Sequence, residues 1–237
     1  MYHSKHIYHH NEHELHGYLA YLEKTDQPRP AVLIAHDWSG QNEFFQQKAK
    51  VFAELGYIGF AIDMFGLGRT EKTNAEKQAL IQPLVKDRLL LRTRIQAAFD
   101  AVSALPEVNQ KKIAIVGYCF GGLCALDLAR SGAEIKGAIS VHGLLHPPTE
   151  LPSQTITAKI LALHGYDDPM VHPEQLTAFC QEMTKEKVDW QVHSFGLTKH
   201  AFTNPQAHDT ELGLMFSADA ASRSNQLIVT FLEEIFG

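Results

Sequence analysis

The chain of 237 residues has few cysteines, no basic cluster and no long apolar run. Its three cysteines, Cys119, Cys124 and Cys180, are odd in number and do not indicate a disulfide framework, which favours a reducing compartment. The net charge is −6, so neither nucleic acid nor an anionic membrane surface is expected as a partner. The apolar runs fall well short of the roughly 18 residues of a membrane span. Residues 1–6 show no signal peptide, and we expect a cytoplasmic protein.

Strand-like and helix-like segments alternate along the chain. Apolar segments of strand length lie at 18–22, 31–36, 57–64, 112–116, 135–141, 159–164 and 189–195. Helical periodicity or composition marks 44–55, 91–102, 123–130, 173–187 and the C-terminal segment. This alternation predicts a single α/β domain over residues 1–237, with a mostly parallel central sheet and helices on both faces. Functional side chains of such sheets gather beyond the carboxyl ends of the strands.

The most informative motif is Gly117-Tyr118-Cys119-Phe120-Gly121-Gly122, between an apolar strand and a helical segment. Strand, tight Gly-x-Cys-x-Gly turn and helix are typical of a nucleophile elbow, here with cysteine in place of the usual serine. The glycines lack Cβ, so the backbone can bend sharply and pass close to its neighbours. The unpaired N–H groups of a helix N-terminus favour a thiolate at Cys119. Taken alone, the motif fits equally well a glycine-rich turn that holds a small buried cysteine.

An acid and a base follow Cys119 in the chain, each after a predicted strand. Asp168 follows the 159–164 strand, and we take it as the acid because Pro169 fixes the turn; Asp167 is the exposed alternative. His200 lies in a loop after the last predicted strand, at the same edge of the sheet. Taken alone, Asp168 could simply form a turn with Pro169, and His200 could simply be a solvated loop residue. Their order along the chain is that of α/β-hydrolases, so together the three residues predict a catalytic triad.

At these residues the sequence resembles the dienelactone hydrolase family. Members typically carry Gly-x-Cys-x-Gly-Gly, then Gly-x-x-Asp-x-x-Val, then His-x-Phe near the end, which are here 117–122, 165–171 and 200–202. The segment Asp63-Met64-Phe65-Gly66-Leu67-Gly68 is also family-like. The resemblance implies an α/β-hydrolase fold. It also implies a hydrolase that cleaves a small ester or lactone through a thioester on a cysteine nucleophile.

The resemblance gives roles to the loop His36-Asp37-Trp38-Ser39-Gly40. In the family this loop carries an acid that contacts the cysteine of the resting enzyme, and the following residue donates a backbone N–H to the oxyanion hole. Asp37 takes the first role here, and the N–H groups of Trp38 and Phe120 form the oxyanion hole. A carboxylate beside a thiol disfavours the thiolate, so Asp37 would keep Cys119 unreactive until substrate arrives. The alternative is that Asp37 serves only as a turn or helix N-cap acid.

The residues expected around the substrate favour a small, uncharged acyl group. Family enzymes that act on dienelactone hold its carboxylate with two arginines, one of them four residues after the catalytic histidine. This chain has Asn204 at that position, which offers hydrogen bonds but no charge. We expect Phe65, Trp38 and Phe202 to form an apolar wall, and a lid segment over about 66–85.

The remaining expectations concern metals, partners and other functions. Six N-terminal histidines have a spacing that fits no compact site, so no metal and no cofactor are expected; they are His3, His6, His9, His10, His13 and His16. The expected partner is a small-molecule ester or lactone, and the protein is expected to be a monomer or a small homo-oligomer. Three alternatives remain open: a thiol-based redox or stress protein on the same fold, an idle hydrolase fold used for binding, and acyl transfer to an alcohol other than water.

Overall fold

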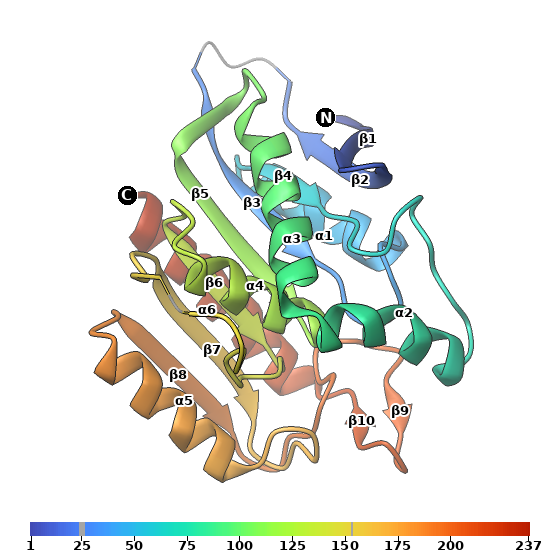
Figure 1. Ribbon diagram of the computed structural model, residues 1–237, viewed down its shortest axis with the longest axis vertical. Coiled ribbons are helices and arrows are strands. Elements are labelled where there is room, and N and C mark those ends of the chain that lie inside the picture. Colours follow the sequence, from blue (N-terminus) through green and yellow to red (C-terminus); the bar gives the residue numbers. More distant parts are fainter. Residues whose placement is uncertain (24–26, 153) are drawn as a thin grey trace.

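Residues 1–23, 27–152 and 154–237, the part of the chain described by this computed structural model, fold around an eight-stranded sheet (Figure 1). Its spatial order is β1-β2-β4-β3-β5-β6-β7-β8. β1 pairs with β2 and β2 with β4 in antiparallel fashion, and every later neighbouring pair is parallel. The strands are β1 (Tyr2–His10), β2 (His13–Tyr21), β3 (Arg29–Ala35), β4 (Ile58–Ala61), β5 (Val108–Tyr118), β6 (Gly137–Val141), β7 (Lys159–Gly165) and β8 (Trp190–Phe195). The sheet is mostly parallel, as the sequence predicts.

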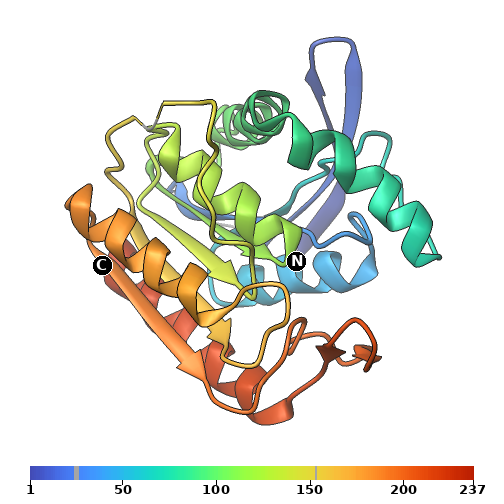
Figure 2. The same ribbon diagram turned by 60° about the horizontal axis from the view of Figure 1, so that its bottom comes forward.

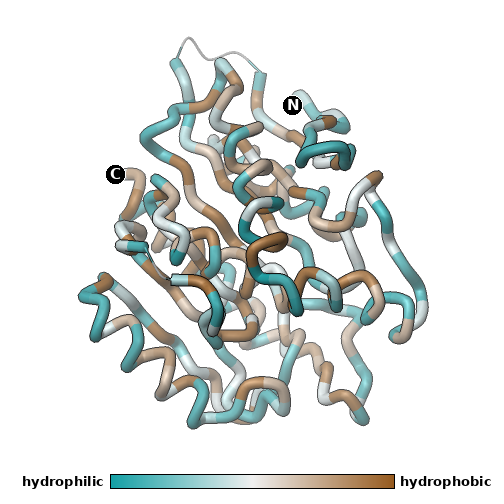
Figure 3. Tube along the Cα trace, in the orientation of Figure 1, coloured by the Kyte–Doolittle hydropathy of each residue, from teal (hydrophilic) through white to brown (hydrophobic). Residues whose placement is uncertain are grey.

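The inner strands divide their side chains between two apolar cores, because successive side chains of a strand point to opposite faces. In β3, Leu33 packs on one face while Val32 and Ile34 pack on the other. In β5, Ile115 and Val116 divide in the same way. All five are fully buried, which explains the nearly continuous apolar runs of these strands. Figure 3 shows the hydrophobic residues along the inner strands.

Helices cover both faces of the sheet (Figures 1 and 2). One core includes side chains of α1 (Glu43–Glu54) and α6 (Ala218–Phe236), and the other those of α3 (Arg88–Ser103), α4 (Phe120–Arg130) and α5 (Pro173–Lys185). A shorter pair, β9 (His208–Asp209) and β10 (Leu214–Met215), forms a separate antiparallel ribbon. Within the described ranges, no helix has the length and apolarity needed to cross a membrane.

Several elements of the fold, among them β1 and a helix in the expected lid segment, were not predicted from the sequence. β1 was not predicted, because its alternation exposes most side chains and buries only Tyr8 and His10; it pairs with β2 in a hairpin that projects from the body (Figure 2). The histidines are spread over this hairpin, and no group of three or more metal-ligating side chains in the described ranges could hold an ion. The polar segment expected to form a lid contains a helix, α2 (Asn74–Lys86), whose reciprocal capping box joins Thr73 and Glu76.

Candidate active site

Cys119 occupies the sharp turn between β5 and α4. Its φ of 54° and ψ of −116° lie in a region that residues other than glycine rarely adopt. The Cys119 N–H donates to the Val141 carbonyl at 3.0 Å, and the Cys119 carbonyl accepts from the Gly122 N–H at 2.9 Å. Such strain persists only where the surroundings fix the backbone, and here both neighbouring elements do so. The half-buried Cys119 side chain reaches the cavity described below.

Two glycines of the motif are required because other parts of the backbone pass too close to them to leave room for a Cβ. A Cβ on Gly117 would lie 1.8 Å from the Gly121 carbonyl oxygen, and a Cβ on Gly121 would lie 2.1 Å from the Ala35 carbonyl oxygen. Both obstacles are backbone atoms, which cannot move aside without displacing a strand or a helix. The Gly-x-Cys-x-Gly pattern therefore reflects how tightly α4 passes over β5 and β3.

Asp168 and His200 meet beyond the ends of β7 and β8. Asp168 Oδ2 accepts a hydrogen bond from His200 Nδ1 at 2.7 Å, and neither side chain is accessible to solvent. The other carboxylate oxygen, Oδ1, accepts from the Met170 N–H at 2.8 Å, which fixes the carboxylate within its turn. Asp167, the alternative acid, is exposed.

Gly165, the last residue of β7, lets the loops that carry the acid and the histidine approach each other. A Cβ at this position would lie 2.5 Å from the Thr198 carbonyl oxygen and 2.7 Å from the Lys199 carbonyl oxygen. The Asp167 N–H also donates to the Thr198 carbonyl at 3.0 Å, which ties the two loops together. The first glycine of the Gly-x-x-Asp motif thus has a packing role in forming the Asp168–His200 pair.

The second ring nitrogen of His200 faces the thiol side of the site. Nε2 is buried and has no hydrogen-bond partner in the described ranges, and His200 lines the same cavity as Cys119. Burial alone lowers the pKa of His200, but the neighbouring Cys119 and Asp168 outweigh it and raise that pKa to about 10. The Cys119 sulfur raises the pKa both through its charge and as a hydrogen-bonding neighbour, although its contact with Nε2 is not well enough aligned to count as a formed hydrogen bond.

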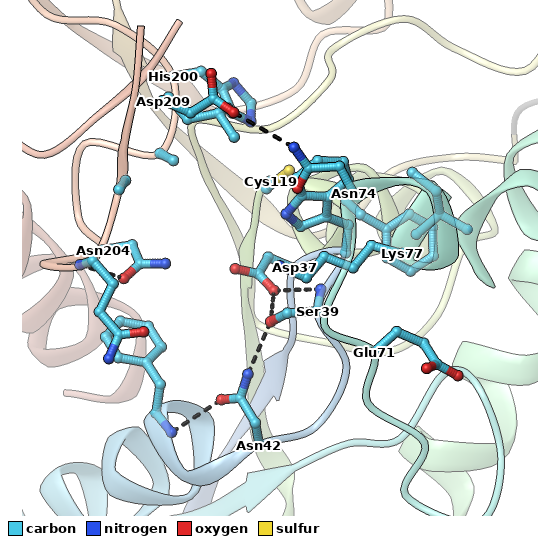
Figure 4. A pocket seen from close by; sticks show the side chains of 18 of the residues that line it. Asp37, Ser39, Asn42, Glu71, Asn74, Lys77, Cys119, His200, Asn204 and Asp209 are labelled. Carbon is cyan, nitrogen blue, oxygen red and sulfur yellow. Dashed lines mark hydrogen bonds between the residues drawn. The ribbon is translucent and has the colours of Figure 1, made fainter. Parts of the chain in front are cut away.

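Cys119 and His200 open into a cavity of about 1310 Å³. Figure 4 shows Asp37 and Lys77 below the thiol, with Asn204 across the cavity. At its mouth the Asn74 amide of α2 donates to the Asp209 carboxylate at 3.5 Å, so α2 and the β9–β10 ribbon meet there. The lid segment expected at about 66–85 thus supplies one wall, through α2 and the loop before it.

The described cavity lining carries more negative than positive charge. Lys77 is its one lysine, its ammonium lying 5.5 Å from the centre of the Trp38 ring, and no arginine is among the described lining residues. One of the carboxylates, Glu71, lies 3.5 Å from the guanidinium of Arg69 outside the cavity. The lining carboxylates are Asp37, Glu43, Glu71, Asp209 and Glu211. An anionic ligand would therefore meet net repulsion, while an uncharged one would not.

Two residues that line the same cavity have unpaired backbone N–H groups. Neither the Trp38 N–H nor the Phe120 N–H donates to a protein acceptor in the described part of the chain. Phe120 is the first residue of α4, so its N–H is one of the free donors of a helix N-terminus. Trp38 and Phe120 both line the cavity beside Cys119, and free donors near a nucleophile are what an oxyanion hole requires.

Asp37 lines the cavity, but its carboxylate is turned toward its own loop. Oδ1 accepts from the Ser39 N–H at 2.8 Å and from the Ser39 hydroxyl, which in turn accepts from the Asn42 amide at 2.8 Å (Figure 4). Among the described residues, no hydrogen bond joins Asp37 to Cys119. These contacts agree with the alternative role for Asp37, that of an acid that stabilises its own turn. Contact with the thiol of the resting enzyme stays a prediction.

Phe65 and Phe202 were predicted to form an apolar wall of the pocket, and this prediction is wrong, since neither residue lines the cavity. Phe65 packs in the core against His36 and Phe120, with ring centres 4.6 and 5.9 Å away. Phe202 is fully buried, its ring centre 5.0 Å from that of His142. Both rings are enclosed by the sheet and its loops. The apolar lining comes instead from Trp38, Phe44, Phe45, Ile81, Val85, Phe120, Leu144 and Leu214.

Asn204 lines the cavity, and Figure 4 shows it opposite Lys77; its role in substrate binding stays a prediction. Its Oδ1 accepts from the Gln206 N–H at 2.9 Å. The side-chain amide N–H groups of Asn204 make no hydrogen bond within the described ranges, so they are available to a ligand. Asn204 thus offers donors without charge at a position where a positive charge would be needed to hold a carboxylate strongly.

His142, a residue with no role predicted from the sequence, packs against His200. Its ring centre is 5.3 Å from that of His200, nearly edge-on, and its Nε2 lies 2.8 Å from the Thr203 hydroxyl. Burial and the nearby His200 keep the pKa of His142 well below the usual histidine range, so the ring is neutral. The available signal was its position directly after the buried strand β6, where functional residues gather.

Sheet order, crossovers and the strand–turn–helix elbow define an α/β-hydrolase fold, and comparison with known proteins agrees. The sequence model described as the dienelactone hydrolase family matches residues 15–236. The crystal structure of a dienelactone hydrolase-like promiscuous phosphotriesterase from metagenomic libraries is 35% identical, covers 100% of this chain and 99% of that chain, and has a TM-score of 0.95. An uncharacterized protein of Caenorhabditis elegans is 34% identical over 149 residues, 62% of this chain and 94% of that protein. The chain belongs to the dienelactone hydrolase family and is a hydrolase.

Proposed function

We propose that the protein hydrolyses small esters or lactones through a thioester on Cys119. One observation carries the proposal: Cys119 and His200 line a single cavity, Asp168 holds His200 from behind, and the lining residues Trp38 and Phe120 have backbone N–H groups with no acceptor in the described ranges. They correspond to the nucleophile, the oriented acid–base group and the oxyanion donors that acyl transfer requires.

Acylation begins when the Cys119 thiolate attacks the carbonyl carbon. A sulfur–carbon bond forms, and the carbonyl oxygen becomes an oxyanion that the N–H groups of Trp38 and Phe120 stabilise. Removal of one such donor typically costs on the order of 3 kcal/mol of transition-state stabilisation. When the carbon–oxygen bond of the ester breaks, the departing alkoxide takes the proton from His200 Nε2.

Deacylation uses the same groups in reverse. His200, now neutral, takes a proton from water while the water oxygen attacks the thioester carbonyl carbon. The tetrahedral intermediate expels the Cys119 thiolate, releases the carboxylic acid and leaves a protonated imidazole beside the sulfur. Asp168 holds Nδ1–H throughout, so Nε2 faces the reacting atoms in both half-reactions.

The negative charge of the cavity lining favours uncharged substrates over anionic ones. Carboxylates outnumber the single lysine Lys77, and Asn204 supplies donors without charge. A substrate carboxylate would be repelled and would find no arginine among the described lining residues. We therefore favour neutral esters and lactones over anionic ones such as dienelactone. Cytoplasmic location and a monomeric or small homo-oligomeric state stay predictions.

A comparison of cysteine variants tests the proposal. Cys119→Ala is expected to lose turnover of p-nitrophenyl acetate and to lose labelling by iodoacetamide at that site. Cys180→Ala, which removes the half-buried thiol of α5, is the matched control and should retain turnover. Retained turnover in Cys119→Ala would overturn the proposal.

A substrate panel separates hydrolysis from the redox alternative. It contains neutral aryl esters, lactones, dienelactone and, because of the similar phosphotriesterase structure, one aryl phosphotriester. We expect turnover of the neutral esters. If the wild type turns over none of them while peroxide converts Cys119 to a stable sulfenic acid, a thiol-based redox function replaces the proposal.

A further inference from the structure

His36 is a fully buried histidine that follows β3 and directly precedes the loop carrying Asp37 and Trp38. Both of its ring nitrogens have partners. Nδ1 lies 2.6 Å from the Asp37 carbonyl oxygen, and Nε2 lies 3.1 Å from the Met64 backbone nitrogen. We propose that His36 is a positioning residue that aims the Trp38 N–H into the oxyanion hole, an inference that rests on the proposed function.

The two contacts fix which nitrogen of His36 carries the proton. The Met64 backbone nitrogen can only donate, so Nε2 must accept and therefore has no hydrogen. Nδ1 of the neutral ring then carries the hydrogen and donates it to the Asp37 carbonyl. Burial lowers the pKa of His36, which keeps the ring neutral and preserves this tautomer.

The peptide bond between Asp37 and Trp38 transmits this contact to the cavity. A trans peptide is planar, and its C=O and N–H point in opposite directions. No cis peptide occurs in the described ranges, so the Asp37 carbonyl held at His36 directs the Trp38 N–H away from His36. Trp38 lines the cavity with Cys119, and its N–H has no protein acceptor. The Asp37 carbonyl also accepts from the Gly40 N–H, but at 3.4 Å that bond is weaker.

Aromatic rings hold the imidazole of His36 in place. The ring of Phe65 lies edge-on to it at 4.6 Å, and those of Phe45 and Phe120 lie 6.1 and 6.3 Å away. These apolar surroundings strengthen the hydrogen bond to the Asp37 carbonyl and leave the ring little room to turn. Without that bond the peptide could rotate and present its carbonyl oxygen to the hole, which would repel an oxyanion.

The Met64 end of the contact is rigid as well. The Asp63 carboxylate accepts from the N–H groups of Phe65 and Gly66 at 2.8 and 2.9 Å and from that of Gly68 at 2.8 Å. It also accepts from the His16 N–H of β2 at 2.9 Å. The family-like segment 63–68 therefore forms a fixed turn whose Met64 N–H sets the tautomer of His36.

Two substitutions of His36 distinguish its hydrogen bond to the Asp37 carbonyl from its hydrogen bond with the Met64 N–H. In His36→Asn the amide nitrogen takes the place of Nδ1 and can still donate to the Asp37 carbonyl. In His36→Gln the amide reaches the place of Nε2, where it can accept from Met64 but no longer donates to Asp37. We expect His36→Gln to lower kcat for p-nitrophenyl acetate by about 10- to 100-fold, with a smaller change in KM. His36→Asn should retain most of the wild-type kcat.

Alkylation of Cys119 by iodoacetamide is the control reaction, because substitution at a saturated carbon forms no oxyanion. Its rate should equal that of wild type in both variants. Equal losses of kcat in both variants, wild-type kcat in His36→Gln, or parallel losses of alkylation would overturn the role of His36 while the wild type still turns over esters. Absence of ester turnover in the wild type would instead overturn the proposed function, and the inference with it.

Nitrogen-15 NMR of the folded wild type tests the tautomer independently of any variant. The expected spectrum has a neutral His36 with its hydrogen on Nδ1. A hydrogen on Nε2 would overturn the inference even if both variants failed to fold.

Discussion

His200 and Asp168 are 32 residues apart in the chain, but His200 Nδ1 and Asp168 Oδ2 lie 2.7 Å apart, and both side chains are fully shielded from water. In such surroundings a charge without its partner is costly, so each residue depends on the other. The contact also leaves His200 Nε2 as the ring nitrogen directed to Cys119.

Asp168→Asn is expected to reduce kcat for p-nitrophenyl acetate by about 10²- to 10⁴-fold, because an amide cannot stabilise the imidazolium or fix its tautomer. Steady-state kinetics on the purified variant measures this. The matched control is Asp167→Asn, which changes the exposed neighbour in the same turn and should retain wild-type kcat. Equal losses in the two variants would contradict the assignment of Asp168.

Removal of the sulfur should lower the pKa of His200. In the wild type, Cys119 and Asp168 raise that pKa to about 10 against the opposing effect of burial. Cys119→Ala deletes both raising effects of the sulfur, its charge and its hydrogen bonding, and leaves the His200 ring buried, so the ring should lose its proton at a lower pH. NMR titration of the His200 ring protons in both proteins checks this. An unchanged pKa would show that the sulfur and the imidazole do not interact.

Much of the fold and site follows from sequence because local pattern and burial agree in the centre of the sheet. The bounds of β3, β7 and α1 differ from prediction by at most a few residues, since each has a clear period or apolar run. The order of Cys119, Asp168 and His200 also located the pair that the structure brings together.

The rest depends on tertiary contacts that no local pattern encodes. β1 is mostly exposed, so its alternation is weak, although β2 provides a complete pairing partner. α2 is polar and buries only Leu84 fully, and its signal was the Thr73–Glu76 capping box rather than periodicity. Phe65 resembled a pocket residue because its motif lies near the site, but its ring packs on His36.

Gly121→Ala should destabilise the fold by about 2 kcal/mol or more, because the new Cβ would lie 2.1 Å from the Ala35 carbonyl oxygen. Gly196→Ala is the control, since a Cβ there meets nothing within 4 Å, and its effect should stay within about 0.5 kcal/mol. Urea unfolding of both variants measures the difference. A stable Gly121→Ala protein would contradict the packing explanation of the motif.

Negative charge in the cavity should discriminate against anionic esters. The succinic half-ester of p-nitrophenol is expected to have a kcat/KM about tenfold below that of p-nitrophenyl acetate. Added salt should reduce this difference in kcat/KM, because it screens the repulsion. Glu211→Gln, which neutralises a lining carboxylate, should also narrow it, whereas Glu134→Gln, at an exposed position outside the lining, should not. Preference for the anionic ester would refute this view of the substrate class.

The most direct measurement concerns the bond between sulfur and acyl carbon. The wild-type reaction with p-nitrophenyl acetate is stopped by acid at short times and the protein is digested. The mass of the peptide that contains Cys119 is then measured by mass spectrometry. We predict one acetyl group on Cys119 that neutral hydroxylamine removes and that disappears once substrate is consumed. Release of p-nitrophenol with Cys119 unmodified at every time, or acetyl on another side chain, would contradict the thioester mechanism.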